Sequence, residues 1–147
     1  PGSTSGQTIC LTDLMATAAA ITGAKLPNNA AEDSYNILPA LLGGNKPIRE
    51  YTLHQTMSLA LAIRSGDWKY LDHKGSGGNN YGREGRWGMK QYALPEKAPK
   101  ALGQLYNLKT DPGETTNLYF EKPEIVEELK AKLEEAKKTG RSAPTRN

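Results

Sequence analysis

The residues best equipped for chemistry are cations and aromatic rings gathered in one glycine-rich stretch. From His73 to Lys100 the chain has six basic and two acidic residues, whereas the net charge of all 147 residues is only +3. Arginine and lysine can pair with an anionic ligand, and arginine can do so through two parallel hydrogen bonds. The stretch lacks the G-x-x-x-x-G-K-[ST] pattern of a phosphate-binding loop. It reads either as a binding loop for another anion or as a solvated insertion.

The chain holds one cysteine, Cys10, and two histidines, His54 and His73. Neither histidine has a second histidine or a carboxylate at metal-ligand spacing, so the sequence predicts no metal site. A single cysteine excludes an internal disulfide framework. Because Cys10 precedes a predicted helix and has apolar neighbours, we expect a buried structural thiol and not a reactive one.

Length and composition exclude several classes of protein. A chain of 147 residues fits one domain or part of a larger one. No apolar run approaches the ~18 residues of a membrane-spanning helix, so we expect no membrane partner. A net charge of +3 is too weak to indicate a nucleic-acid partner. Regular apolar spacing in several stretches argues against full disorder.

Two short helices are predicted in the first third of the chain. The first would be capped by the Thr12 hydroxyl and end at Gly23. Its apolar face would consist of Leu11, Leu14, Ala18 and Ile21. The second spans Ile37–Leu42, with Pro39 in its first turn and two glycines after it.

The rest of the chain predicts an antiparallel sheet and a closing helix. Apolar residues alternate on both sides of the turn Ser65–Asp67, which indicates a β-hairpin. Further strands are predicted at 51–55 and 105–108, while residues 72–102 show no period. Pro123 opens a helix with one apolar stripe that ends near residue 138, and a mobile tail is expected from Arg141 onward. The fold class is therefore α+β, with about four strands packed by a C-terminal helix.

Four segments, in order, resemble the C-terminal third of the type I sulfatases, the formylglycine-dependent arylsulfatase family. The first is L-T-D-L-M-A-T at residues 11–17, where the family often has proline in place of Ala16. The second is D-S followed by L-P-A-L-L-G, within residues 33–43. The third is A-I-R-S-G-D-W-K at 62–69, and the fourth is L-Y-N-L-K-T-D-P-G-E, then N-L, within 105–118.

The resemblance implies a reactive centre that this chain lacks. Family members carry a C-x-[PA]-x-R motif near their N-terminus, whose cysteine becomes formylglycine, together with a calcium ion held by carboxylates and an amide. Cys10 is followed by Thr12 and Leu14 at the positions where the motif has Pro or Ala and then Arg, so it is not that nucleophile. Formylglycine and calcium are thus expected in an upstream part, and no cofactor in this chain. Residues 1–46 would end the α/β core, and 47–147 would form the C-terminal subdomain.

The resemblance also implies where substrate would bind, because loops of this subdomain help to select substrate in the family. We expect contacts to a sulfated carbohydrate from His54, His73, Lys74, Arg83, Arg86 and Trp87. Plain packing or solvent exposure is the alternative for each of these residues. The function expected is that of a C-terminal fragment of a sulfuric ester hydrolase, inactive alone. A non-catalytic binding module for sulfated glycans and a purely structural fragment are the alternatives.

A fragment of this kind has consequences for partners and compartment. The opening Pro1–Gly6 reads as a loop, in keeping with a fragment. The two core helices would then lack their upstream partner, so we expect an exposed apolar patch with self-association or weak order. Family habit suggests the periplasm, secretion or the lysosome, and the sequence leaves the compartment open.

Overall fold

The computed structural model describes residues 2, 4–56, 59–74 and 98–146. The chain divides into two compact units. Unit 1 contains residues 1–52 and 135–147, and unit 2 contains residues 53–134. Each is considered by itself below.

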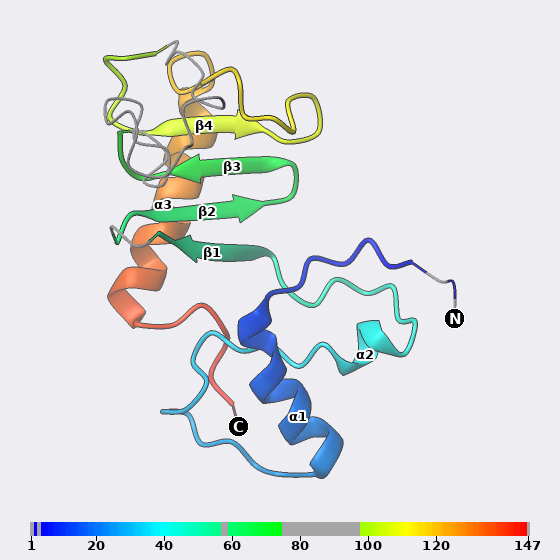
Figure 1. The fold of residues 1–147 in the computed structure, drawn as a ribbon. Coiled ribbons are helices and arrows are strands. Elements are labelled where there is room, and N and C mark those ends of the chain that lie inside the picture. The colour runs from blue at the N-terminus through cyan, green and yellow to red at the C-terminus, as the bar shows by residue number, and fades with distance from the viewer. Residues whose placement is uncertain (1, 3, 57–58, 75–97, 147) are drawn as a thin grey trace, which may run out of the picture. The chain divides into compact units, whose positions relative to one another are not determined.

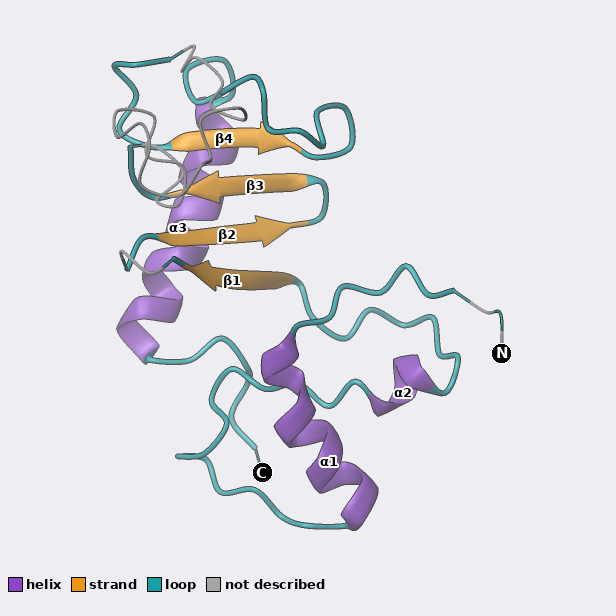
Figure 2. Ribbon diagram, in the orientation of Figure 1, coloured by secondary structure: helices purple, strands orange, loops and turns teal. Residues whose placement is uncertain are grey.

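A four-stranded sheet forms the centre of unit 2, with the strand order β1-β2-β3-β4 (Figure 1). The strands are β1 (Tyr51–Gln55), β2 (Leu61–Ser65), β3 (Trp68–Leu71) and β4 (Gln104–Asn107). Both β2–β3 and β3–β4 are antiparallel. The helix α3 (Pro123–Thr139) crosses one face of this sheet, as the colouring by secondary structure makes plain (Figure 2). The predicted α+β class, hairpin and closing helix are confirmed.

The register of the strands explains the core of unit 2. Ile63 pairs with Tyr70, and Tyr70 pairs with Leu105, so the three side chains share one face of the sheet. All three are buried, as are Leu129 and Leu133 on α3. The turn between β2 and β3 is made possible by Gly66, whose φ of 56° lies in the left-handed region that glycine adopts without strain. Alternating apolar residues around a glycine turn are thus sufficient to build this hairpin.

Gly103 allows the chain to pass close to β3 on its way into β4. A Cβ atom at this position would lie 2.5 Å from the Leu71 carbonyl oxygen and 2.9 Å from the Tyr70 ring. No side chain larger than hydrogen therefore fits without displacing backbone.

Tyr70 is a buried titratable group whose hydroxyl donates a hydrogen bond to Asp72 Oδ1 over 2.9 Å. Burial, followed by this hydrogen bond to a carboxylate, raises the pKa of Tyr70 well above its ordinary value near 10. Because the folded state favours the protonated phenol, its contribution to stability is complete below pH ~10 and is lost as the pH rises toward the folded-state pKa.

We therefore expect the free energy of unfolding to fall above pH ~10, and to fall less in Tyr70→Phe than in the wild type. Urea unfolding of the wild type and of Tyr70→Phe between pH 8 and 11 measures the two decreases. In Tyr70→Phe the decrease is smaller but still present, because burial also raises the pKa of Tyr35. An equally steep loss in Tyr70→Phe would show that Tyr70 does not titrate as inferred.

Unit 1 begins with a short 3-10 helix, η1 (Leu11–Asp13), continued by α1 (Leu14–Thr22) and later by α2 (Leu38–Leu41). α1 ends at Gly23, which adopts φ 72° as the sequence predicts. The predicted cap is wrong, however. The Thr12 hydroxyl donates to the Asp33 carbonyl, and Asp13 Oδ2 instead accepts from the Cys10 N–H. The Asp13 carboxylate thus binds the N–H of the residue that precedes η1, and its negative charge suits the positive end of the helix.

The apolar stripe predicted for the first helix faces outward. Leu11, Leu14 and Ile21 are 84%, 59% and 64% exposed. The buried face of α1 is formed instead by Ala16, Thr17 and Ala19. The expectation of exposed apolar side chains on this helix is thus confirmed.

The prediction of a mobile tail is wrong for Arg141–Arg146, which binds residues 27–35 through several hydrogen bonds. The Ala143 N–H, for example, donates to the Glu32 carbonyl over 3.0 Å, and Ala143 itself is 4% exposed. Mobility is expected of a terminal segment that follows the last helix, but the partners of this segment lie more than 100 positions away in the chain.

Candidate functional site

The structure describes three of the six residues predicted to bind substrate. His54 lies exposed on β1. His73 is half-buried just after the end of β3, and the next residue, Lys74, is exposed. The His73 ring atom Nδ1 lies 2.5 Å from the Lys74 carbonyl oxygen. Arg83, Arg86 and Trp87 fall outside the described residues. Binding of a sulfated sugar by these six residues therefore stays a prediction.

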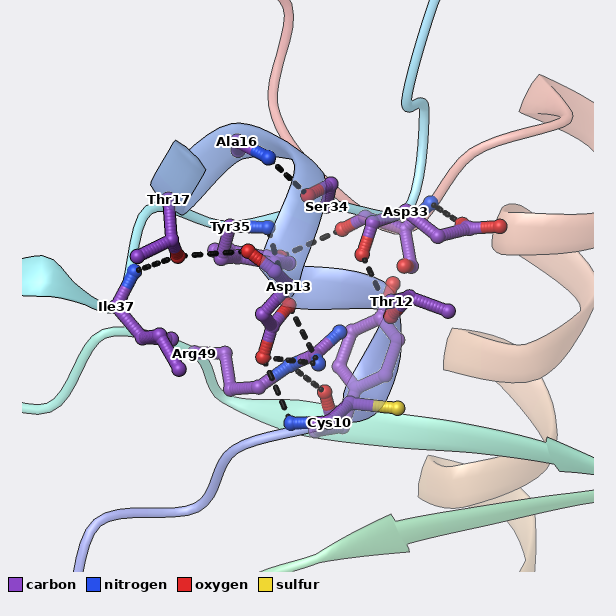
Figure 3. Close-up of polar contacts among 12 residues, drawn as sticks. Cys10, Thr12, Asp13, Ala16, Thr17, Asp33, Ser34, Tyr35, Ile37 and Arg49 are labelled. Atoms are coloured by element: carbon purple, nitrogen blue, oxygen red, sulfur yellow. Dashed lines mark hydrogen bonds and ion pairs between the residues drawn. The ribbon is translucent and has the colours of Figure 1, made fainter. Parts of the chain in front are cut away.

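A buried ion pair forms the best-defined polar centre of unit 1 (Figure 3). Arg49 Nη1 lies 3.0 Å from both carboxylate oxygens of Asp13, and the two side chains are 1% and 0% exposed. Arg49 Nε also donates to the Tyr51 carbonyl, and its guanidinium stacks 4.6 Å from the centre of the Tyr35 ring. A buried pair of this kind is retained only when further hydrogen bonds compensate the loss of water.

The Asp13 carboxylate has further partners from the backbone. The Cys10 N–H donates to Oδ2 over 2.7 Å and the Tyr35 N–H donates to Oδ1 over 3.0 Å. Asp13 therefore joins three separate pieces of chain: the start of η1, the segment at Tyr35, and Arg49 (Figure 3). Because a carboxylate only accepts hydrogen bonds, one ionised side chain can hold all of these donors together.

Two hydroxyls extend the polar centre along α1. Thr17 Oγ1 donates to the Asp13 carbonyl over 2.7 Å and accepts from the Ile37 N–H over 3.1 Å. Ser34 Oγ accepts from the Ala16 N–H over 2.8 Å. These contacts satisfy buried backbone donors that would otherwise be costly to desolvate. The polar centre thus positions chain segments, and its two charged side chains, Asp13 and Arg49, are buried.

Cys10 belongs to this centre through its backbone. Its side chain is half-buried, so the expectation of a buried thiol is not met. Burial acts to raise the pKa of the Cys10 thiol, but hydrogen bonding to Thr12 and the nearby Arg49 guanidinium outweigh burial and hold the pKa below its ordinary value. Cys10 stands at the position before η1, where its N–H completes the hydrogen bonding of Asp13.

The polar residues of segment 105–118 also have structural partners. Asp111 accepts hydrogen bonds from the Thr115 and Thr116 N–H groups. Asn117 Oδ1 accepts from the Leu105 N–H over 3.0 Å, and Asn117 Nδ2 donates to the Gly103 carbonyl. The Asn117 side chain therefore occupies part of the outer edge of β4 as a neighbouring strand would, which protects that edge.

The charged residues of the β2–β3 hairpin have polar partners. Lys69 Nζ lies 2.6 Å from Glu114 Oε1, and both side chains are partly buried. Lys109 Nζ lies 3.9 Å from Asp67 Oδ2 at the exposed turn. Arg64 is exposed and donates through Nε to the Gly66 carbonyl over 3.4 Å. These contacts tie the segment after β4 to the β2–β3 hairpin.

Part of the polar centre around Asp13 and Arg49 could be recognised from the sequence. The resemblance covers residues 11–17 and 33–34, which include Asp13 and Ser34, but no prediction from the sequence pointed to Arg49. No local pattern marks Arg49, because its partner lies 36 positions earlier in the chain. The one available signal was the presence of an arginine between the apolar Ile48 and the start of a strand.

The described residues contain no group of three or more His, Cys, Asp or Glu side chains that could hold a metal ion. None of the helices in the described part of the chain has the length and apolar content of a membrane span.

Comparisons with known proteins agree with the arrangement above. No family model matches the chain. The chain is 34% identical over 125 residues to the N-acetylgalactosamine-6-O-sulfatase of Bacteroides thetaiotaomicron, a match that covers 85% of this chain and 22% of that protein.

Solved structures give the same result. One solved structure comes from work on the metabolism of multiple glycosaminoglycans by Bacteroides thetaiotaomicron. It matches with a TM-score of 0.62 and 32% identity, and the match covers 86% of this chain and 24% of the chain in that structure. A 2-O GAG sulfatase, at 22% identity and a TM-score of 0.55, shares the fold over 91% of this chain and 26% of its own. The chain thus spans roughly a quarter of the length of these relatives. Over most of its length the chain is therefore similar to part of a sulfatase, in agreement with the resemblance of its sequence to the C-terminal portion of that family.

Proposed function

We propose that the chain forms the C-terminal part of a sulfuric ester hydrolase that acts on sulfated carbohydrate. The observation that carries this proposal is the match, at 34% identity across 85% of the chain, to an N-acetylgalactosamine-6-O-sulfatase. In this role the chain contributes loops beside the substrate pocket. The nucleophile and the metal ligands belong to the larger part of the enzyme.

The surroundings of Cys10 support the proposal that the nucleophile belongs to the larger part of the enzyme. Its N–H is fixed on Asp13, and the residues two and four positions later are Thr12 and Leu14, which do not fit C-x-[PA]-x-R. Cys10 therefore contributes its N–H to the structure of unit 1. We place the group that attacks the sulfate ester in the larger part of the enzyme.

The reading frame upstream of Pro1 in the source DNA tests the proposal directly. An open frame that contains C-x-[PA]-x-R would support it. A stop codon immediately before Pro1 would contradict it and favour a separate product. The purified chain should also fail to hydrolyse an aryl sulfate in the presence of calcium, and turnover above background would overturn the assignment of the nucleophile to the absent part.

The substrate contacts are proposed for the segment that follows β3. The end of β3 is held by the hydrogen bond from the Asp72 N–H to the Leu61 carbonyl, and His73 and Lys74 come directly after it. Their position at a fixed strand end favours a role in binding, because a rigid element can place a side chain reproducibly. We place His54, Arg83, Arg86 and Trp87 in the same binding surface.

A second candidate function, a non-catalytic module that holds sulfated glycans, is favoured by the excess of cations between His73 and Lys100. Titration with 6-O-sulfated and unsulfated N-acetylgalactosamine oligosaccharides at low and moderate salt tests the binding surface. Arg83→Ala with Arg86→Ala should lose the preference for sulfate. Arg64→Ala, which removes an exposed arginine from the hairpin turn, should keep it. Absence of any sulfate preference in the wild type would refute the binding surface.

The exposed stripe of Leu11, Leu14 and Ile21 is proposed to contact the remainder of the enzyme. Without that partner, the isolated chain should self-associate to remove the stripe from water. We expect the weight-average mass in sedimentation to rise with concentration for the wild type, and to stay near 16 kDa for Leu11→Ser with Leu14→Ser.

Leu102→Ser is the matched control for this experiment, because Leu102 is 71% exposed but lies in unit 2. It should associate like the wild type. A wild-type chain that stays monomeric at every concentration, with strong hydrogen-exchange protection over residues 11–44, would show that the stripe needs no partner.

A further inference from the structure

The C-terminal segment Ser142–Arg146 and the loop Pro27–Ser34 form a densely hydrogen-bonded contact within unit 1. The two segments are more than 100 residues apart in sequence. The backbone of the C-terminal segment is aligned by three contacts. The Ser142 N–H donates to Asp33 Oδ1 over 2.7 Å, the Ser142 carbonyl accepts from the Tyr35 hydroxyl over 2.6 Å, and the Ala143 N–H donates to the Glu32 carbonyl over 3.0 Å.

Arg146 anchors the far end of this contact. Its Nη1 donates to the Ala30 carbonyl over 2.7 Å, and its Nη2 donates to the carbonyls of Ala31 and Ser34 over 2.7 and 3.1 Å. The Arg146 N–H donates to Asn28 Oδ1 over 2.6 Å. Several backbone carbonyls therefore converge on one planar guanidinium, an arrangement that a fork of five N–H donors can satisfy.

The loop contains a residue with a strained backbone conformation. Ala31 has a φ of 54°, a left-handed conformation that side chains other than glycine adopt only at a cost. Carbonyls that turn toward one point also repel one another unless a donor or cation lies between them. Arg146 supplies both the donors and the positive charge at that point.

We infer that the loop Pro27–Ser34 is a binding site for the chain's own C-terminal segment, with the Arg146 guanidinium as the group that the site recognises. The site selects arginine over lysine, because an ammonium group is a compact charge and cannot reach several separated carbonyls in one plane. Through Ser34, whose Oγ accepts from the Ala16 N–H, the occupied site also fixes the start of α1. This inference stands apart from the proposed hydrolase function.

Hydrogen exchange on the full chain tests the inference, with Arg146→Ala, Arg146→Lys and Thr145→Ala compared to the wild type. The reporters are the Ala30, Ser34 and Ala143 amides, which donate to Pro27, Ala31 and Glu32. In Arg146→Ala these amides should exchange about ten- to a hundredfold faster, since hydrogen bonds made by a charged group are lost. Arg146→Lys should fall between this variant and the wild type.

Thr145→Ala is the matched control, because Thr145 is the exposed neighbour of Arg146 in the chain. It should leave the three reporter amides within about twofold of the wild type. The Leu108 and Leu118 amides of unit 2, which donate to Asp67 and Leu105, report whether each variant remains folded. Reporter amides that exchange equally fast in Arg146→Ala and Thr145→Ala, with unit 2 protected in both, would overturn the inference.

Discussion

Replacing Arg49 by methionine is expected to lower the free energy of unfolding by about 3–5 kcal/mol. The substitution keeps an unbranched apolar stem but leaves the Asp13 carboxylate, which is 0% exposed, without its cation. An uncompensated buried charge is far more costly than a missing contact at the surface. Urea unfolding followed by circular dichroism measures the loss, provided that the slope with denaturant is unchanged.

Two further variants separate the effect of the stranded buried charge on stability from the effect of losing a side chain. Arg64→Met makes the same chemical change at an exposed arginine and should stay within about 0.5 kcal/mol of the wild type. The double variant Asp13→Leu with Arg49→Met removes both charges and should recover much of the stability, because no ion is then stranded. If Arg49→Met costs less than about 1 kcal/mol, the ion pair does not hold unit 1 together as inferred.

Replacing Leu133 by alanine is expected to cost about 2–5 kcal/mol. Leu133 is 0% exposed on the apolar stripe of α3, so the change removes buried methyl groups and leaves a cavity in the core of unit 2. Alanine favours helix formation at least as well as leucine, so the loss cannot come from helix propensity. Thermal and urea unfolding of the two chains give the difference.

Leu102→Ala is the control, since it deletes the same atoms from a side chain that is 71% exposed. It should change the free energy of unfolding by no more than about 0.5 kcal/mol. Equal losses at Leu133 and Leu102 would mean that α3 does not bury its stripe in the core.

Most of unit 2 could be predicted from local sequence. The turn at Gly66 and the alternation on both sides of it are short-range features, and they specified β2 and β3 to within two residues. The same holds for α3, where proline at the first position and one apolar stripe fixed the start, the face and the end. These elements follow from backbone preferences and from the periodicity of burial, which act between neighbours in the chain.

The candidate binding residues show how far the resemblance reaches. It indicated a relationship to the C-terminal portion of sulfatases, which the similarity to solved and curated sulfatases supports. The resemblance did not reveal which contacts the polar residues of the four matching segments make. The structure shows that Asp13, Asp111 and Asn117 bind backbone groups, so these motif residues stabilise the fold.

By itself, the sequence determined the helices, the hairpin, the α+β class and the relationship to sulfatases. Only the tertiary structure decided that Asp13 pairs with Arg49 and that Arg146 binds the loop Pro27–Ser34. The physical reason is the distance along the chain. Such contacts join residues 36 to 119 positions apart, and no local pattern of charge or hydrophobicity records which of many possible partners a buried group will meet.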